Sequence, residues 1–221
     1  MLLNKWTFGN GGGAAIWQIA ESEEELLALL ASLQTEKAFA AVKAGLAELH
    51  NPSRRREWLA VRMLVAQCLG NAHIISYKSS GRPFLADGSW PISISHTKEY
   101  AALAWLPDGT VGIDIERRTD RVMRVVRKFI NAEEQAALDA SHFTSPDGEL
   151  LLWTAKEALY KAVGIRELDC LEALTVHIPS PEEQHTTARC TTNGATYKIA
   201  FLFAEEFVCS LARLLENNPK N

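Results

Sequence analysis

The chain has 221 residues, of which 47% are hydrophobic, with 23 Lys plus Arg against 27 Asp plus Glu. This composition is typical of a folded globular protein and excludes a disordered or fibrous one. A net charge of −4 argues against a general nucleic-acid-binding protein, which carries a basic excess. No apolar run reaches the roughly 20 residues that a membrane-spanning helix needs. We therefore expect neither a membrane nor a nucleic acid as partner.

The cysteines and the N-terminus favour a reducing cytoplasm. The four cysteines lie far apart and form no CxxC pair, so neither a zinc site nor a disulfide framework is expected. They are Cys68, Cys170, Cys190 and Cys209. The first ten residues also lack the basic start and apolar run of a secretory signal. The prediction is a cytoplasmic protein.

The start of the chain predicts one strand and two helices. The glycine-rich stretch Gly9–Gly13 lacks the Lys and Ser/Thr of a phosphate-binding loop and is interpreted as a flexible lead-in. A strand is expected at 14–19. Ser22 and Glu25 have the spacing of a capping box before a leucine-rich helix. A stronger helix is expected at 53–69, where apolar residues recur at intervals of three and four.

The middle of the chain is strand-like. Four short apolar runs separated by Gly, Pro and Asp predict a small antiparallel sheet that crosses the midpoint. The runs are 74–77, 91–95, 101–106 and 111–116. The turn Pro107–Gly109 is a candidate boundary, because proline fixes φ and glycine permits a reversal. We therefore expect an N-terminal half, 1–108, and a C-terminal half, 109–221.

The second half predicts helices at about 120–129 and 148–163, followed by strands of a second sheet at 175–178 and 197–211. Strands and helices are thus mixed in both halves. The fold class expected from this order is α+β, in two parts.

Two carboxylates in the strand-like run 111–116 form the first candidate site. Side chains two apart on a strand point to the same side, so Asp114 and Glu116 project together while Ile113 and Ile115 enter the core. A divalent cation relieves the repulsion between two carboxylates, and oxygen ligands select Mg²⁺ or Mn²⁺ rather than zinc. The alternative is an edge strand with solvated acids.

The helix at 148–163 carries the second candidate site. Its apolar stripe consists of Leu151, Ala155, Ala158 and Ala162. Trp153, Glu157 and Lys161 follow a neighbouring line at intervals of four. Glu157 could complete a carboxylate metal site, with Lys156 and Lys161 neutralising phosphate oxygens. The alternative is an ordinary surface pair between Glu157 and Lys161.

Two further motifs point to anion binding. Arg82 lies in the turn Gly81-Arg82-Pro83, and Ser95-His96 ends a predicted strand. Adjacent Ser and His do not form a hydrolytic triad, and no GxSxG motif is present. Hydroxyl and imidazole donors suit a phosphate, although a strand-end histidine can simply be a surface group. Three arginines, Arg54 to Arg56, open the helix at 53–69, where cations oppose the helix dipole and favour an external anion.

Taken in order, these motifs resemble those of 4′-phosphopantetheinyl transferases of the two-halved, surfactin-synthetase-activating (Sfp-like) type. The resemblance rests on four motifs, on the arginine helix near Arg56, and on Phe129-x-x-x-Glu133. The four motifs are Gly81-Arg82-Pro83, Ser95-His96, Gly112-Ile113-Asp114-Ile115-Glu116 and Trp153-x-x-Lys156-Glu157-Ala158-x-x-Lys161. Ser93 departs from the family, which commonly has Asn there. Arg82 stands where Lys is also common.

The resemblance implies a fold of two similar halves, each a small, mainly antiparallel sheet packed with helices, with coenzyme A in the cleft between them. It implies that Asp114, Glu116 and Glu157 hold Mg²⁺, with Mn²⁺ as an alternative. Glu157 would also act, directly or through water, as the base, and Lys161 would contact coenzyme A phosphates, with Lys156 next in line. The nucleotide end, chiefly the 3′-phosphate, would be held by Arg56, Arg82, Ser95 and His96.

The function implied is transfer of 4′-phosphopantetheine from coenzyme A to a serine of an apo acyl or peptidyl carrier protein, giving holo carrier protein and 3′,5′-ADP. Two alternatives stay open. One is a non-catalytic protein that binds coenzyme A and a carrier. The other is a Mg²⁺-dependent hydrolase of the coenzyme A pyrophosphate. The two-halved design favours a monomer.

Spacing also suggests a basic docking face. The residues Arg117, Arg121, Arg124 and Lys128 form a line on the predicted helix, if that helix extends back to position 117. Carrier proteins of this system are typically acidic, so such a face would steer one to the site. The alternative is a solvated helix face.

Overall fold

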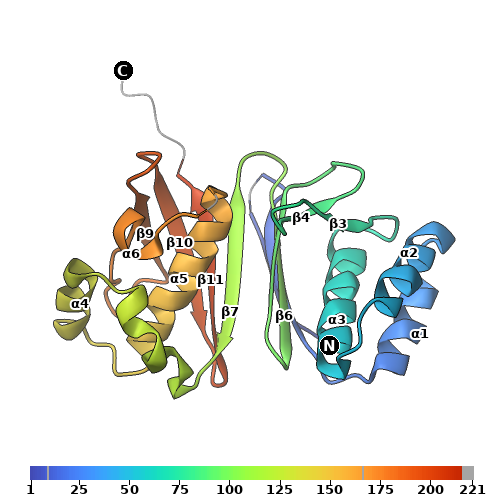
Figure 1. Ribbon diagram of the computed structural model, residues 1–221, viewed down its shortest axis with the longest axis horizontal. Coiled ribbons are helices and arrows are strands. Elements are labelled where there is room, and N and C mark those ends of the chain that lie inside the picture. The colour runs from blue at the N-terminus through green and yellow to red at the C-terminus, as the bar shows by residue number, and fades with distance from the viewer. Residues whose placement is uncertain (9, 166, 216–221) are drawn as a thin grey trace. The chain divides into compact units, whose positions relative to one another are not determined.

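The computed structural model describes residues 1–8, 10–165 and 167–215. It divides into two compact units, Met1–Asp108 and Gly109–Asn221 (Figure 1). Each unit combines an antiparallel sheet with helices, so the expected mixture of α and β structure is confirmed. Among the described residues, no helix combines the length and apolarity needed to cross a bilayer.

The N-terminal unit is built on a four-stranded antiparallel sheet with the order β1-β2-β6-β5. Its strands are β1 (Leu2–Thr7), β2 (Gly13–Gln18), β5 (Ile92–His96) and β6 (Tyr100–Trp105). A separate two-stranded ribbon pairs β3 (Ile75–Tyr77) with β4 (Pro83–Leu85). The edge position of β5 leaves its last residue, His96, at the rim of this sheet.

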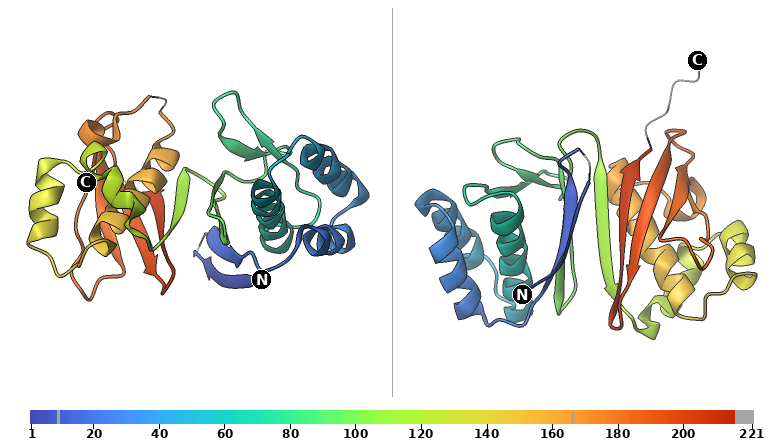
Figure 2. Two further views of the ribbon diagram at one scale, coloured as in Figure 1. Left: turned by 60° about the horizontal axis from the view of Figure 1, so that its bottom comes forward. Right: turned by 180° about the vertical axis from the view of Figure 1, so that it is seen from behind.

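Three helices, α1 (Glu23–Leu33), α2 (Glu36–Ala47) and α3 (Pro52–Cys68), lie on one side of this sheet (Figure 2). The predicted capping box starts α1: the Ser22 side chain accepts from the Glu25 backbone, and Glu25 accepts from the Ser22 backbone. The buried side of α3, with Leu59, Met63 and Leu64, joins the core formed with β2 and β6. This packing fixes the orientation of α3 on the sheet. It therefore also fixes the position of the opposite, more polar side of its N-terminal turns.

Residues 10–12 of the glycine-rich stretch belong to the connection between β1 and β2, so the stretch follows the first strand and is not a lead-in to it. Gly9 lies outside the described residues, but Phe8 N donates to Gly12 O at 2.7 Å and closes the β1–β2 connection. A Cβ on Gly13 would lie 2.4 Å from the Trp105 ring and 2.5 Å from Trp6 O. Close packing between neighbouring strands, rather than flexibility, therefore requires glycine at position 13.

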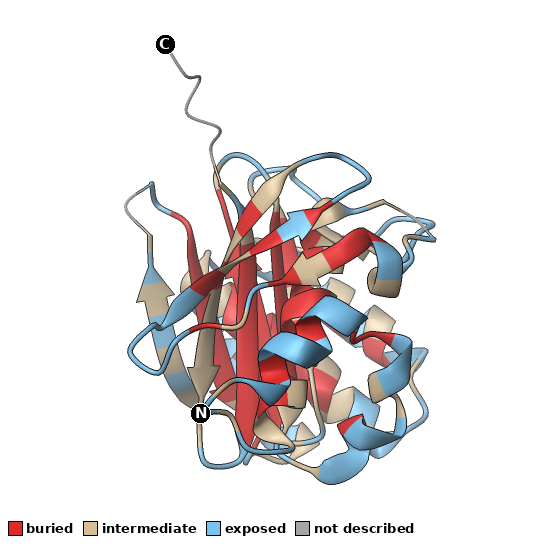
Figure 3. Cartoon of the chain, turned by 90° about the vertical axis from the view of Figure 1, so that its left-hand side faces the viewer, coloured by how far each residue is buried: buried red, intermediate tan, exposed pale blue. Residues whose placement is uncertain are grey.

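The C-terminal unit has a five-stranded antiparallel sheet with the order β7-β11-β10-β9-β8. Its strands are β7 (Val111–Arg117), β8 (Leu174–Val176), β9 (His185–Cys190), β10 (Thr196–Phe203) and β11 (Phe207–Leu214). The long helix α5 (Asp147–Val163) packs across β7 and β11, with α4 (Ala132–Asp139) and α6 (Cys170–Ala173) beside it. Figure 3 shows burial concentrated in the strands and on the sheet-facing sides of the helices.

Of three predictions about these elements, two were wrong. No sheet crosses the midpoint in the described part of the chain: β5 and β6 pair within the N-terminal unit, and β7 pairs with β11. The run 197–211 lies in the second sheet, as predicted, and it contains parts of two strands, because 204–206 turns the chain from β10 to β11. The predicted helix 120–129 is two short 3₁₀ helices, η1 (Asp120–Arg124) and η2 (Val126–Lys128), separated at Val125.

The break at Val125 removes the predicted basic line. Arg117 is the last residue of β7 rather than part of a helix, so it does not share a helical face with Arg121 and Arg124. Arg121, Arg124 and Lys128 are exposed, while Val122 and Phe129 are buried in the core of the unit. An apolar inner side and a basic outer side are therefore present, but not as one continuous helical stripe.

Candidate functional site

The site in the C-terminal unit depends on a close approach of α5 to β7. A Cβ on Gly112 would lie 1.8 Å from Ala158 O and 2.7 Å from Ala162 N. The absence of a side chain at Gly112 lets the helix backbone rest on the strand. On the neighbouring strand, β11, α5 makes a polar contact. The hydroxyls of Thr154 and Ser210 are hydrogen-bonded to each other at 2.7 Å, so both groups have a partner.

The line Trp153, Glu157 and Lys161 on α5 faces Asp114 and Glu116 on β7. Lys161 Nζ lies 2.7 Å from Asp114 Oδ1, and Trp153 Nε1 donates to Glu116 Oε1 at 3.4 Å. The helix and the strand run in opposite directions here, which sets Glu157 on the turn between these two contacts. The five residues that the sequence placed on two separate elements therefore come together.

Burial and mutual repulsion govern the charges of this cluster. Burial, followed by the charge of Asp114, raises the pKa of Glu116. Burial, then Asp114, and more weakly Glu116, also raise the pKa of Glu157, against the opposing effect of Lys161. Three carboxylates thus share a partly buried space with one ammonium group, and additional positive charge would stabilise their ionised forms.

The ligand chemistry of the cluster fits a hard divalent cation. Asp114, Glu116 and Glu157 offer only carboxylate oxygens, which suit Mg²⁺ or Mn²⁺. The raised pKa values of Glu116 and Glu157 indicate an excess of negative charge that a cation would balance. As they stand, no three acidic, histidine or cysteine residues among those described are close enough together to hold a metal ion. The type of ligand and the charge of the cluster therefore fit a divalent cation. In this structure Lys161 pairs with Asp114.

The expected surface pair between Glu157 and Lys161 is not what the structure contains. Lys161 donates to Asp114 and, at 2.9 Å, to Ile113 O. In the described part of the chain, Glu157 makes no hydrogen bond or ion pair. Its carboxylate is accordingly available to accept a proton or to bind a cation.

Lys156 does not join the carboxylate cluster. Its side chain is buried, Nζ lies 2.7 Å from Glu134 Oε2, and it donates to Phe129 O at 2.5 Å and Cys170 O at 3.0 Å. Burial lowers the pKa of Lys156 and outweighs the opposing effect of Glu134. This position does not support the expectation that Lys156 contacts phosphate oxygens.

Glu134, not Glu133, is the structurally engaged acid after Phe129. Glu133 is exposed on α4, whereas Glu134 is 1% exposed and also accepts from Val176 N at 2.9 Å. The Phe129 ring packs edge-on against Trp153, with ring centroids 4.9 Å apart. The Lys156 ion pair therefore supports the segment that holds Trp153 in place.

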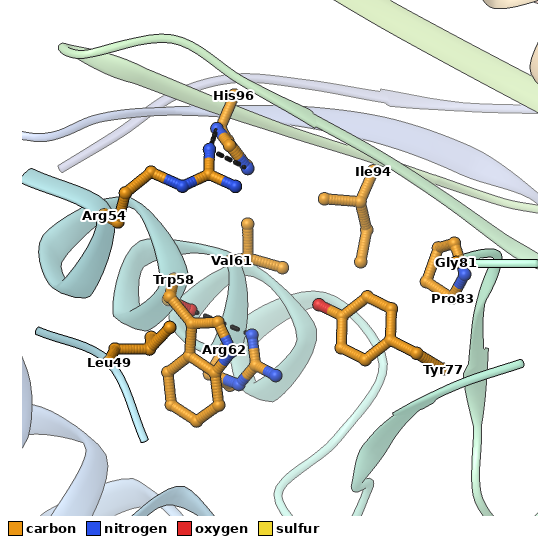
Figure 4. A pocket seen from close by; sticks show the side chains of 10 residues that line it. All are labelled: Leu49, Arg54, Trp58, Val61, Arg62, Tyr77, Gly81, Pro83, Ile94 and His96. Atoms are coloured by element: carbon orange, nitrogen blue, oxygen red, sulfur yellow. Dashed lines mark hydrogen bonds between the residues drawn. The ribbon is translucent and has the colours of Figure 1, made fainter. Parts of the chain in front are cut away.

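The N-terminal unit has its own candidate site, a pocket of about 310 Å³ between α3, β5 and the β3–β4 ribbon (Figure 4). Its lining contains three residues with cationic or imidazole side chains and no acid. The lining residues are Leu49, Arg54, Trp58, Val61, Arg62, Tyr77, Gly81, Pro83, Ile94 and His96. A pocket of this composition suits an anionic ligand that also has apolar or planar surface.

Arg62 brings a buried positive charge to this pocket. It is 5% exposed, its guanidinium carbon lies 3.2 Å from the centroid of the Trp58 ring, and it donates to Trp58 O at 3.1 Å (Figure 4). Burial lowers the pKa of Arg62 to about 10, partly offset by Tyr77. In the described residues it pairs with no carboxylate.

Of the four residues expected at the nucleotide end, only His96 lines the pocket. Arg82 lies between the lining residues Gly81 and Pro83 without being one of them. Ser95 is buried and projects from the other face of β5, because neighbours on a strand alternate. Arg56 lies about 200° around α3 from Arg54, given 100° per residue.

The run Arg54 to Arg56 predicted an anion at this end of α3, and the resemblance selected Arg56, whereas Arg54 is the one of the three that lines the pocket. Trp58, Arg62 and Tyr77 were not predicted as pocket residues. The spacing of four between Arg54, Trp58 and Arg62 was the available signal, since it places all three on one helical face. The three consecutive arginines obscured it. Arg55 in fact forms an ion pair with Glu23 and donates to Leu46 O, so it anchors α3 to its neighbours.

Comparison with known proteins points to one family. Residues 110–212 match the model of the 4′-phosphopantetheinyl transferase superfamily. The matched segment includes β7 and α5, and with them all five side chains of the cluster formed by Asp114, Glu116, Trp153, Glu157 and Lys161. The match covers just under half of the chain.

Individual proteins agree with this match. The chain is 31% identical over 119 residues to the 4′-phosphopantetheinyl transferase AcpT of Salmonella typhi and to that of Salmonella typhimurium, covering 50% of this chain and 60% of each relative. It is 28% identical over 121 residues to a putative 4′-phosphopantetheinyl transferase of Synechocystis, covering 48% of this chain and 47% of the relative. The chain thus matches between about half and 60% of the length of these relatives. All three relatives carry the name of 4′-phosphopantetheinyl transferase, the third as a putative one, which is also the superfamily whose model matches.

Proposed function

We propose that the protein transfers the 4′-phosphopantetheine group of coenzyme A to a serine of an apo carrier protein. The observation that carries this proposal is the arrangement of Asp114, Glu116, Glu157 and Lys161 on β7 and α5, inside the segment that matches the superfamily model. In the reaction the serine oxygen attacks the β-phosphorus of coenzyme A, the phosphoanhydride bond breaks, and 3′,5′-ADP leaves.

The residues of the cluster have distinct roles in this proposal. Asp114, Glu116 and Glu157 would hold Mg²⁺, which when bound offsets negative charge on the pyrophosphate oxygens. Glu157, whose pKa burial raises, accepts the serine proton directly or through water. Lys161 is held at Asp114 and supplies positive charge for a phosphate oxygen. Phosphoryl transfer of this kind needs positioning and charge rather than a protein nucleophile.

The nucleotide end of coenzyme A belongs, in this proposal, to the pocket of the N-terminal unit. Arg54, Arg62 and His96 supply its positive and hydrogen-bonding groups, and Trp58 and Tyr77 its aromatic surface. The expected contacts of Arg56, Arg82 and Ser95 with the nucleotide remain predictions, since none of them lines the pocket. The partner is an acidic acyl or peptidyl carrier protein, and the exposed arginines of η1 are its proposed docking point.

Intact-protein mass spectrometry tests the transfer directly. Several apo carrier proteins are incubated with coenzyme A, Mg²⁺ and this protein, and one phosphopantetheine addition is expected on at least one carrier. Replacing the carrier serine with alanine should abolish the addition. Coenzyme A binding without any addition would instead indicate a binding protein, and release of 3′,5′-ADP without a carrier would indicate a hydrolase.

A further inference from the structure

A buried acid lies behind the rim of the pocket in the N-terminal unit. Glu57 is 6% exposed and projects from the same side of α3 as the lining residues Arg54 and Val61. Its Oε2 atom lies 3.2 Å from Arg54 Nη1 and 3.1 Å from His96 Nδ1, and Ser53 Oγ donates to its Oε1 at 3.1 Å. One carboxylate therefore touches both basic side chains at the rim.

The two rim side chains are in direct contact with each other. Arg54 Nη1 lies 3.3 Å from Nδ1 and 3.2 Å from Nε2 of His96, so the guanidinium rests against the imidazole ring (Figure 4). This contact costs free energy whenever His96 is protonated, because like charges repel at this distance. The negative charge of Glu57 offsets that repulsion and favours the arrangement in which both side chains stay at the rim.

We propose that Glu57 is a positioning residue for anion binding: it holds Arg54 and His96 together as one binding unit at the rim of the pocket. The inference rests on the proposed function, in which this pocket receives the phosphate-bearing nucleotide end of coenzyme A. Glu57 itself does not line the pocket. It acts through the two side chains it touches, and its own charge would repel a phosphate that reached it.

Glu57→Gln tests this role because glutamine keeps the size of the side chain and one acceptor oxygen but removes its charge. Glu23→Gln is the matched control: it removes the same charge from an ion pair with Arg55, on the same helix but outside the pocket. The probes are 3′,5′-ADP and 5′-AMP, which differ by the 3′-phosphate. Titration calorimetry measures both without carrier protein or metal, and thermal unfolding checks the fold of each variant.

The wild-type protein and Glu23→Gln should bind 3′,5′-ADP about tenfold or more tightly than 5′-AMP, since a charge-assisted hydrogen bond contributes that much. In Glu57→Gln the preference should fall to about threefold or less. Equal preference in Glu57→Gln and wild type would overturn the inference, as would a wild-type protein with no preference at all. A purely structural role would weaken both nucleotides alike and leave their ratio unchanged.

A double-mutant cycle tests the mechanism. If Glu57 acts by holding Arg54 against His96, then adding Glu57→Gln to the variant Arg54→Gln should change 3′,5′-ADP binding by less than about twofold. Additive losses would overturn the inference. These measurements are independent of catalysis: a protein that fails to modify any carrier but shows this coupling contradicts only the proposed function, and an active enzyme without the coupling contradicts only the role of Glu57.

Discussion

Lys161 Nζ on α5 lies 2.7 Å from Asp114 Oδ1 on β7, and the same ammonium donates to Ile113 O at 2.9 Å. This contact joins the two motifs that carry the proposed chemistry. It requires the helix to rest on the strand at Gly112, where no side chain would fit. The most informative variants therefore change either the charges of this contact or the spacing that permits it.

Asp114→Asn should abolish transfer while leaving the fold intact. Asparagine keeps an oxygen that accepts from Lys161 but lacks the charge that would hold Mg²⁺, so we expect the rate to fall by at least about 100-fold. Intact mass spectrometry of the carrier gives the rate, and circular dichroism gives the unfolding temperature. Turnover retained with unchanged Mg²⁺ dependence would overturn the metal assignment.

Gly112→Ala should separate the two motifs. The added Cβ would lie 1.8 Å from Ala158 O, so α5 must move, at a cost of about 1–3 kcal/mol or more. Because α5 carries Glu157 and Lys161, the transfer rate should fall by more than the loss of folded protein alone would explain. Gly194→Asn in the β9–β10 turn is the control, since a Cβ there meets no atom within 4 Å and asparagine tolerates a φ of 70°. Full activity of Gly112→Ala would show that the close approach is not needed.

The carboxylate cluster could be predicted from sequence because both of its parts depend on local periodicity. Alternation on a strand put Asp114 beside Glu116, and intervals of four on a helix aligned Trp153, Glu157 and Lys161. The meeting of these two lines depends on how the helix packs on the sheet. The resemblance to a family predicted that step, whereas periodicity did not.

Other parts of the structure depended on contacts that no local pattern encodes. Lys156 belongs to the same motif as Glu157, yet one helical step turns it toward Glu134 and the core. Among three consecutive arginines, packing alone decides that Arg54 reaches the pocket and Arg55 pairs with Glu23. Strand β1 was missed because one of its faces is exposed, so its run of residues is not apolar.

Lys156→Met should act on stability rather than on chemistry. The substitution leaves the 1% exposed Glu134 carboxylate without its ion-pair partner, and breaking a buried pair costs about 3–5 kcal/mol. Urea denaturation measures the loss. The double variant Glu134→Gln/Lys156→Met should recover part of it, because the unpaired charge is gone. Unchanged stability together with a large loss of kcat would instead return Lys156 to the catalytic residues.

The Glu23–Arg55 ion pair should give the protein an acid-dependent stability. Hydrogen bonds from Arg55, and then its charge, lower the pKa of Glu23 below its ordinary value of 4.5. The folded state therefore binds this proton less readily than the unfolded state, so the contribution is complete above pH 4.5 and is lost as the pH falls through the lower, folded value. Glu23→Gln should cost about 1 kcal/mol at pH 7 and progressively less below pH 4.5. Urea denaturation at several pH values measures this, and a cost independent of pH would contradict the assignment.

Charge reversal at Arg121 and Arg124 should weaken the use of carrier protein. Both side chains are exposed on η1, and the buried Val122 between them anchors this segment to the core, so the arginines stay outward. An acidic carrier would lose attraction to this surface, and the KM for carrier should rise about tenfold at low salt, with a smaller change for coenzyme A.

Lys37→Glu/Lys43→Glu, on exposed positions of α2, makes the same change in net charge and should leave the KM for carrier unchanged. Because screening weakens such attraction, the difference between the two variants should shrink as salt is added. Equal carrier kinetics for the wild type and the η1 variant at low salt would exclude this docking surface.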